Sequence, residues 1–558
     1  MDSNEARTDT THQPILILKE GTSRGRPRDV LGTNASAVRI VAEVIKTSYG
    51  PQGLDKMLVG PVDNLPFTIT KDAATILKDL GTVHPAARLA VEAITEENIP
   101  GGDAAGAIVI LGAELLAEAE KLVDSNYSVQ SIVDVYGKTT QQALQILGKI
   151  STRVGLEDVQ AFKAVARAYL TSKMFSPDER ELADLVVAAL LSLSRRNSKG
   201  TYATLAQNIK IIKRLGAPLS ASQFIRGYLI ESPIVQRGMP RKVENARILI
   251  ADVSIGELPE NSLGDFVQNL LKIGARVVIT TGEVDEALQR LLATSGVMAV
   301  AGIPKRDAEG LARIAGGRVV RDLRYLSRAD LVDSKFVKEV IIEDSRWTLI
   351  EGRGNAKAAT LVIGGPSPRE LDRVEQSLRN AILATSELML RPKVVLGGGA
   401  AELQLAHRLR RWSAKLTEND RFVVKAFTVA LESIPWTLAN NSSQDPVQVL
   451  DRLRYMHEHG RSHYGISPLE GRVSDMMKER VFEPLTVKER VLTAATRLAS
   501  RLIPIDDIIA APSGEIPVSE IPNLTIRKIV SYDEDIAQDK TMTRGTATDD
   551  EFLRSFPE

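Results

Sequence analysis

The sequence predicts a multidomain α/β protein in which an α/β domain is inserted into a mainly helical one. The first observation is length, because 558 residues exceed what one ordinary hydrophobic core can hold. The second is the helical spacing of apolar residues, which fills the first 150 residues and returns beyond residue 368. The third is a set of short β-branched runs between these two helical parts.

The first helical part begins with residues 34–58, which predict a long helix followed by a turn. Val38, Ala42 and Ile45 share one face of this helix, and Gly50 marks its end. The same apolar spacing predicts four more helices, at residues 73–80, 86–98, 105–122 and 129–147.

The middle of the chain predicts strands. Helical stretches separate several of its β-branched runs, which favours a partly parallel sheet. The runs are ENARILIADV, GARVVITTG, GVMAVAG, GGRVVRDL and FVKEVIIED.

Helical spacing then resumes and predicts helices at residues 371–388, 400–416, 423–438 and 487–502. From residue 512 the chain is polar and interrupted by Pro and Gly, which predicts a mostly flexible tail. A short strand is predicted within it at residues 524–530.

Composition limits the classes of function. Basic and acidic residues both number 71, so no bulk charge favours nucleic acid as a partner. No apolar run approaches the length needed to cross a bilayer, and the polar start is unlike a secretory signal, so we expect a cytoplasmic protein without a membrane partner. The absence of Cys excludes thiolate sites, and any metal should be a hard cation held by carboxylates and phosphate oxygens.

Three glycine-marked turns are candidates for a phosphate site, at residues 49–57, 102–105 and 397–402. Each can present backbone N–H groups at a helix end, although a tight turn explains each one alone. None matches GxxxxGK[ST], which excludes a P-loop ATPase. Within the second turn, Asp103 follows Gly101 and Gly102 and by itself is typical of a helix cap.

Taken together and in this order, the turns resemble those of the group II chaperonins, the thermosome family of archaea and its eukaryotic cytosolic relatives. The likeness runs along nearly the whole chain, from LKEGTSR to IDDIIAA. Its distinctive segments include YGPQGLDKML, FIRGYLIESPIVQRGMPRKVENARI, LGGGAAELQLAHRLR and VFEPLTVKERVLTAATRLASRLIPIDDII.

This resemblance implies a chaperonin fold with a helical equatorial ATP domain, a small intermediate domain and an α/β apical domain that binds unfolded polypeptide. It also implies a double ring of homologous subunits. The matching limits are 1–154 and 404–511 for the equatorial domain, 155–226 and 366–403 for the intermediate domain, 227–365 for the apical domain and 512–558 for the tail.

The resemblance further implies a site for ATP and Mg²⁺. In the family motif GDGTT the Asp holds the magnesium ion and its neighbours bind phosphates; here Asp103 matches that Asp. Asp72 in KDAATIL matches a family Asp close to the γ-phosphate and the attacking water. The other residues matched to nucleotide contacts are Gly50, Pro51, Gly53, Gly102, Ala104, Ala105, Lys173, Gly398, Gly399 and Glu483.

Two departures from the family pattern bear on hydrolysis. Ala104 replaces the Gly of GDGTT, and Ala105 and Gly106 replace its two Thr, so their hydroxyl donors are missing. Asn380 stands where relatives carry an Asp that swings down on closure to orient the hydrolytic water. An amide cannot accept a proton as a carboxylate can, and lost acid–base help costs about 10²–10⁴ in rate. We therefore expect ATP binding rather than efficient hydrolysis.

A third departure concerns the helical protrusion that closes the chamber in relatives. Between the strands matched to 246–252 and 275–279 lie only enough residues for one crossover helix, at about 263–273. The sequence therefore predicts a shortened protrusion, which is compatible with simple loss of a surface loop or with a subunit that contributes little to a lid.

Three hypotheses follow from these observations. The chain is an ATP-driven folding chaperonin subunit with slow hydrolysis, a structural or regulatory subunit of a hetero-oligomeric ring, or a chaperonin-like protein that acts outside any ring. The matches at 72, 103 and 173 favour nucleotide binding, whereas those at 104, 105 and 380 favour impaired turnover.

Overall fold

The computed structural model describes most of the chain between residues 23 and 510. The predicted tail, the strand predicted at 524–530 and Lys173 lie outside the described residues. These are residues 23–24, 27–59, 67–82, 84–96, 102–155, 157–172, 178–196, 202–203, 206–254, 260–342, 344–353 and 358–510.

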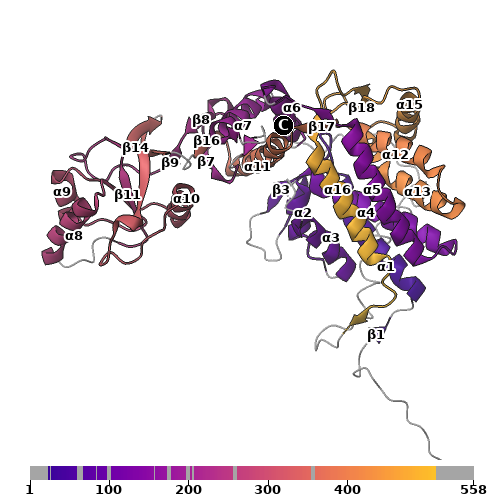
Figure 1. The fold of residues 1–558 in the computed structure, drawn as a ribbon, viewed down its shortest axis with the longest axis horizontal. Coiled ribbons are helices and arrows are strands. Elements are labelled where there is room, and N and C mark those ends of the chain that lie inside the picture. The colour runs from indigo at the N-terminus through magenta and orange to yellow at the C-terminus, as the bar shows by residue number, and fades with distance from the viewer. Residues whose placement is uncertain are drawn as a thin grey trace, which may run out of the picture.

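The molecule is elongated and consists of three parts in a row (Figure 1). We call residues 27–153 with 393–510 the helical body, residues 159–226 with 359–390 the connecting layer, and residues 227–353 the α/β unit. Each part has its own cluster of buried apolar side chains. The α/β unit is one uninterrupted stretch, whereas each of the other two is built from two separate stretches.

The helical body joins both ends of the chain around one core. Its buried residues come from segments 35–147 and 395–503, so neither stretch can bury its apolar faces alone. Its helices are α1 (Pro27–Lys46), α2 (Ala73–Asp79), α3 (Pro85–Glu96), α4 (Asp103–Asp124), α5 (Val129–Ile150), α12 (Ala400–Ser413), α13 (Glu418–Leu431), α14 (Ser433–Asn441), α15 (Pro446–Glu458) and α16 (Leu485–Leu502).

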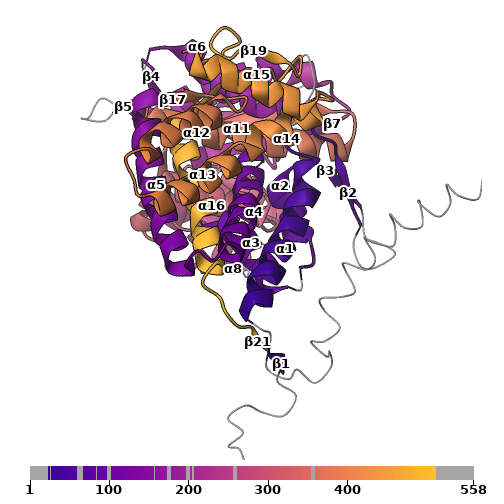
Figure 2. The same ribbon diagram turned by 90° about the vertical axis from the view of Figure 1, so that its right-hand side faces the viewer.

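Helix α4 lies at the centre of this body and packs against α1, α13 and α16 (Figure 2). Its side chains from Ala104 to Ala113 are buried on every face, which explains why it is apolar all round. A Cβ added at Gly112 would lie 2.8 Å from Leu498 Cδ2, so α4 and α16 approach closely there. The middle of α4 is thereby packed closely against α16.

One segment, Glu418–Asn441, is apolar and long enough by composition to span a membrane, with a mean hydropathy of 1.3 in its best window. In that window 67% of the residues are buried, as in the core helix of a globular protein. The segment is also broken at Glu432, whose buried carboxylate pairs with Arg410 at 2.7 Å and Arg454 at 2.5 Å. The single helix predicted at 423–438 is therefore two helices, α13 and α14.

Short strand pairs complete the helical body and tie distant segments together. A three-stranded sheet of β4 (Thr152–Arg153), β17 and β20 connects residues near 150, 395 and 483. In that sheet, β17 spans Lys393–Leu396 and β20 spans Phe482–Pro484. The other strands of the helical body form three antiparallel pairs: β1 (Ser23–Arg24) with β21 (Ile509–Ala510), β2 (Lys56–Leu58) with β3 (Thr68–Thr70), and β18 (Tyr464–Ile466) with β19 (Val473–Asp475).

The connecting layer packs three helices on a small sheet. Strand β16 lies between β7, with which it is parallel, and β8, with which it is antiparallel. Helices α6 and α7 were not predicted from apolar spacing. The elements are α6 (Val159–Thr171), α7 (Glu179–Leu193), α11 (Pro368–Leu390), β7 (Ile209–Leu215), β8 (Gln223–Arg226) and β16 (Ala359–Gly365), with the short pair β5 (Arg195–Arg196) and β6 (Tyr202–Ala203).

One face of α11 is docked on the helical body through contacts spaced three or four residues apart. The Arg369 guanidinium lies 3.7 Å from the Phe67 ring centroid, and the Arg373 guanidinium lies 3.5 Å from the Asp55 carboxylate. Further along, Gln376 donates to Thr75 Oγ1, and Asn380 Nδ2 donates to Asp72 Oδ2 at 3.3 Å. We call these four contacts the docking face, because residues at such spacing share one side of a helix.

The α/β unit confirms the predicted partly parallel sheet. Its order is β13-β12-β11-β14-β15-β9, with β10 on β14; β11, β12 and β13 are parallel and the other pairs are antiparallel. Its elements are β9 (Tyr228–Ile230), β10 (Lys242–Glu244), β11 (Arg247–Ala251), α8 (Glu260–Ile273), β12 (Val277–Thr280), α9 (Glu286–Thr294), β13 (Met298–Val300), α10 (Lys305–Ala315), β14 (Leu331–Ile342) and β15 (Ser345–Gly352).

Four of the five predicted strand runs form strands, but the run GGRVVRDL does not. It makes only one isolated bridge, from Val320 to Ala251, because the charged Arg321 and Asp322 that follow leave the sheet for an exposed turn. The crossover between β11 and β12 contains α8, close to the predicted helix at 263–273. Among the described residues of this crossover there is no second helix.

Candidate functional site

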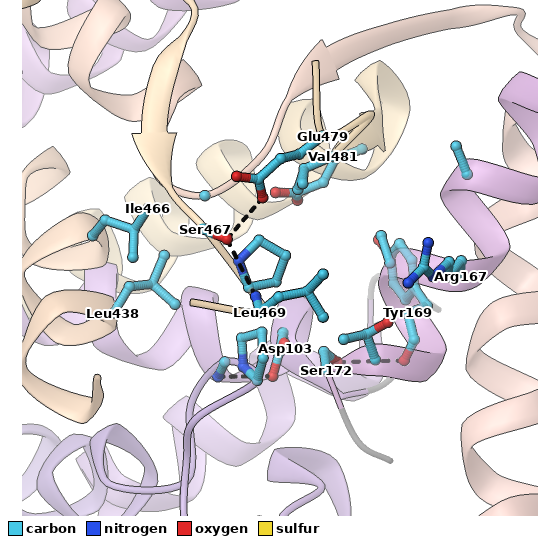
Figure 3. A pocket seen from close by; sticks show the side chains of 18 of the residues that line it. Asp103, Arg167, Tyr169, Ser172, Leu438, Ile466, Ser467, Leu469, Glu479 and Val481 are labelled. Atoms are coloured by element: carbon cyan, nitrogen blue, oxygen red, sulfur yellow. Dashed lines mark hydrogen bonds between the residues drawn. The ribbon is translucent and has the colours of Figure 1, made fainter. Parts of the chain in front are cut away.

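A cavity of about 570 Å³ lies where the helical body faces the connecting layer. Figure 3 shows Arg167 and Tyr169 of α6 on one side, and Leu438 of α14 and Ile466 of β18 on the other. Most of the site residues predicted from the sequence meet here. Those that line the cavity are Gly50, Pro51, Asp103, Ala104, Gly398, Gly399 and Glu483.

Asp103 is not the cap of α4, contrary to its local interpretation. The cap position belongs to Gly102, which has φ 79° and ψ −129° and offers no side-chain bond. Asp103 is the first helical residue, lines the cavity, and accepts a hydrogen bond on Oδ1 from the Gly50 amide at 3.3 Å. The carboxylate therefore ties the start of α4 to the turn after α1, at a helix end where negative charge is favourable.

The turn before α12 lines the cavity with two glycines, Gly398 and Gly399, so its backbone is not covered by side chains. Gly398 and Gly399 have φ 61° and 78°, a region that disfavours other residues. A Cβ at Gly398 would lie 2.5 Å from the Ile466 carbonyl oxygen, and one at Gly399 would lie 2.6 Å from Pro435 Cβ. Only glycine fits at either position, so the N–H groups at this helix start can approach an anion.

The residues of the turn after α1 have two different roles. Gly50, with φ 79°, and Pro51 line the cavity. Gly53 does not line it, and its glycine is required because a Cβ there would lie 2.4 Å from the Ser48 carbonyl carbon. Gly53 therefore shapes the turn that places Gly50 opposite Asp103.

A buried charge cluster supports the back of the cavity. Lys488 Nζ lies 2.5 Å from Glu402 Oε1 and 2.9 Å from Glu483 Oε2. Burial alone would lower the pKa of Lys488, but the two carboxylates outweigh it and hold this pKa well above its usual value. Burial raises the pKa of Glu483, with Lys488 opposing the shift. The cluster joins α12, β20 and α16 beside the cavity.

The described residues contain no group of three or more His, Cys, Asp or Glu side chains that could hold a metal ion by themselves. His457 lies in the polar stretch HEHGRSH, and its Nε2 is paired with the Tyr464 carbonyl at 2.9 Å. Of the other carboxylates that line the cavity, Glu483 is paired with Lys488, Glu479 with Ser467 and Asp184 with Lys163. A hard cation held by Asp103 would need phosphate and water oxygens for its other ligands. The residues present fit Mg²⁺ held together with a nucleotide.

A sequence model of the TCP-1/cpn60 chaperonin family matches residues 41–513 of the chain. The chain belongs to this family. The thermosome subunit beta of Aeropyrum pernix is 35% identical over 520 residues, covering 89% of this chain and 94% of that one. The thermosome subunit alpha of Archaeoglobus fulgidus is 35% identical over 524 residues, covering 90% and 96%.

A solved structure described as the open-state monomer of a group II chaperonin from Methanococcoides burtonii is similar to this chaperonin. The TM-score is 0.63 at 28% identity, covering 72% of this chain and all of the other. The predicted chaperonin fold is thus confirmed, with the helical body as the equatorial part, the connecting layer as the intermediate part and the α/β unit as the apical part.

The structure places the two predicted catalytic residues of this chaperonin together but outside the cavity lining. Asp72 caps α2, accepting on Oδ1 from the Thr75 amide at 2.9 Å and the Thr75 hydroxyl at 3.0 Å. Its Oδ2 accepts from Asn380 of α11. Asn380 presents its amide nitrogen to this oxygen, because the nitrogen is the donor of the amide group.

The residues at the phosphate motif of this chaperonin differ in what they contact. Ala104 lines the cavity, but Ala105 is fully buried and does not. At Gly106 an added Cβ would lie 3.1 Å from both Ile45 Cγ2 and Tyr49 Cδ2. The space that a larger side chain would need at position 106 is therefore occupied by Ile45 and Tyr49.

The sequence analysis missed several residues that line the chaperonin's cavity. Ser467 donates to Glu479 at 2.8 Å beside it, and Tyr49, Arg167 and Tyr169 line its walls. A signal was present for three of them, because Tyr49 is the first residue of the predicted turn 49–57 and the other two lie a few residues before Lys173. Ser467 and Glu479 carry no motif and reach the cavity through the loop after β18.

Proposed function

We propose that this chaperonin subunit binds ATP with Mg²⁺ in the cavity at the start of α4 and hydrolyses it slowly. The observation that carries the proposal is the convergence of Asp103 with the backbone turns at Gly50, Gly398 and Gly399 on one cavity. Magnesium, when bound through Asp103, would neutralise phosphate charge. The glycine turns would orient the phosphates.

Support for slow hydrolysis comes from position 380. Its side chain is an amide, and both oxygens of the nearby Asp72 are engaged by Thr75 and Asn380. No carboxylate at position 380 is available to take a proton from water, so we expect hydrolysis about 10²–10⁴ slower than an acid–base catalysed step.

Asp103→Asn is expected to weaken Mg²⁺-dependent ATP binding at least tenfold, because the amide cannot hold a hard cation as a carboxylate does. Isothermal titration of the full chain with ATP, with and without Mg²⁺, measures this. Asp124→Asn, at the exposed far end of α4, is the matched control and should leave affinity unchanged. Equal affinities for the wild type and Asp103→Asn would refute the site.

We further propose that the subunit works in the cytoplasm in a ring with homologous subunits and that its α/β unit binds unfolded polypeptide. Exposed large apolar side chains on that unit support the second point: Leu271, Leu291, Tyr325 and Ile341.

A catalytically impaired structural subunit of a mixed ring is the second candidate. Two observations favour it. The side chain at position 380 is an amide, and the crossover between β11 and β12 contains α8 and no second helix among its described residues, in line with the predicted shortened protrusion. Mass photometry followed by steady-state ATP hydrolysis, with and without co-expressed homologous subunits, separates the two. Turnover by a ring of this chain alone would exclude the impaired subunit, whereas incorporation into an active mixed ring without turnover alone would establish it.

A further inference from the structure

Two tyrosines line the cavity with more than nine-tenths of their surface buried. Tyr49 is 6% exposed and Tyr169 is 9% exposed. Within the described part of the chain, neither hydroxyl makes a hydrogen bond. By contrast, the hydroxyl of the core residue Tyr136 donates to the Leu115 carbonyl at 3.0 Å. Because both side chains border the cavity, a molecule bound there would be the nearest partner for either hydroxyl.

The two side chains stand on different walls. Tyr49 is fixed by its backbone, whose carbonyl accepts from Asn441 Nδ2 at 2.8 Å, while its ring packs on the first turn of α4 at Gly106. Tyr169 comes from α6 in the connecting layer and lies beside Arg167 (Figure 3). A molecule in the cavity would therefore be approached from the helical body and from the connecting layer.

Both hydroxyls are suited to donate a proton in a hydrogen bond and not to lose it. Burial raises the pKa of each tyrosine, and the charges of Asp103 and Glu483 raise it further while Lys488 lowers it. Asp103, Glu483 and Lys488 affect the pKa of both tyrosines, so the two phenols share one electrostatic environment. A protonated phenol near a helix start is a donor for an anionic acceptor.

We propose that Tyr49 and Tyr169 donate their hydroxyl hydrogens to phosphate oxygens of the bound nucleotide, one from each wall. This inference rests on the proposed nucleotide site and adds residues to it. The Tyr49 ring occupies the room that a side chain at position 106 would need, and it carries a hydroxyl of its own. The phenols thus supply side-chain donors, which Ala104, Ala105 and Gly106 lack.

The test is titration of the full chain with ATP, ADP and adenosine in Mg²⁺ buffer, comparing wild type with Tyr49→Phe and Tyr169→Phe. Each variant should bind ATP and ADP about tenfold to a hundredfold more weakly, because a hydrogen bond to a charged group is lost. Adenosine, which lacks phosphate, should bind each variant as it binds wild type.

Tyr136→Phe is the matched control, because it removes a hydroxyl bonded within the core of the same body. It should lower the thermal midpoint of the nucleotide-free protein and leave ATP affinity unchanged. Tyr49→Phe and Tyr169→Phe should keep or raise the thermal midpoint of the nucleotide-free protein and weaken ATP binding. A merely structural role for the cavity tyrosines would lower that midpoint.

Unchanged ATP affinity in both cavity variants would overturn the inference while leaving the nucleotide site intact. An equal loss for adenosine would overturn the assignment to phosphate. Failure of the wild type to bind ATP would refute the proposed function, and the inference with it.

Discussion

Asn380→Asp is expected to raise the steady-state rate of ATP hydrolysis by about 10²–10⁴, because it supplies a carboxylate able to take a proton from water. The structure adds a reason why this carboxylate would be active. It would lie beside Asp72, where the amide nitrogen is now 3.3 Å from Oδ2. Two carboxylates so close do not both ionise readily, and a shared proton moves one pKa toward neutrality.

The measurement is phosphate release by the assembled protein at saturating MgATP across pH. Gln376→Glu is the matched control, because it adds a carboxylate one turn earlier on the docking face, against Thr75 instead of Asp72. It should not raise the rate. No increase with Asn380→Asp would show that the missing carboxylate is not the limiting defect.

Lys488→Met is expected to lower the free energy of unfolding of the helical body by about 3–5 kcal/mol, because it leaves the buried Glu402 carboxylate and the half-buried Glu483 carboxylate without their cation. Met has a similar length and no charge, so the change isolates the ion pairs with Glu402 and Glu483. Urea unfolding followed by tryptophan fluorescence measures it. A Trp347→Phe background leaves Trp412 and Trp436, which both belong to the helical body.

Lys121→Met, an exposed lysine on α4, is the control and should change the midpoint little. The pH dependence of the free energy of unfolding is a second test of this role of Lys488. Because the folded pKa of Lys488 lies above its ordinary value of 10.5, its stabilisation is complete below that pH and is lost as pH rises through the folded value. Wild type should therefore lose stability in alkali by a component that Lys488→Met lacks; parallel curves would contradict this role.

Much of the fold could be predicted because its signals are local. Helix α4 has an unbroken apolar pattern after a glycine turn, and β11 and β12 are short β-branched runs separated by one helix. Helix α15, which is absent from the predicted helices, has a local signal too, because Asp445 caps it and Pro446 is its first residue.

Other features depend on partners far apart in the chain. The division between α13 and α14 at Glu432 depends on Arg410 and Arg454, which no pattern around residue 432 reveals. The same holds in the candidate site. The glycine turns and Asp103 can be predicted from their local sequence. The hydrogen bond between Asn380 and Asp72 cannot, because it joins residues 308 positions apart.

The docking face has a mechanical consequence. Helix α11 continues through Arg391 into β17, which is paired within the helical body, so its C-terminal end is the fixed end of a lever. At about 1.5 Å per residue, Asn380 lies roughly 15 Å from that end and Arg369 roughly 30 Å. A small swing would therefore move Arg369 about twice as far as Asn380, so the contact with Phe67 would release first and the contact with Asp72 last.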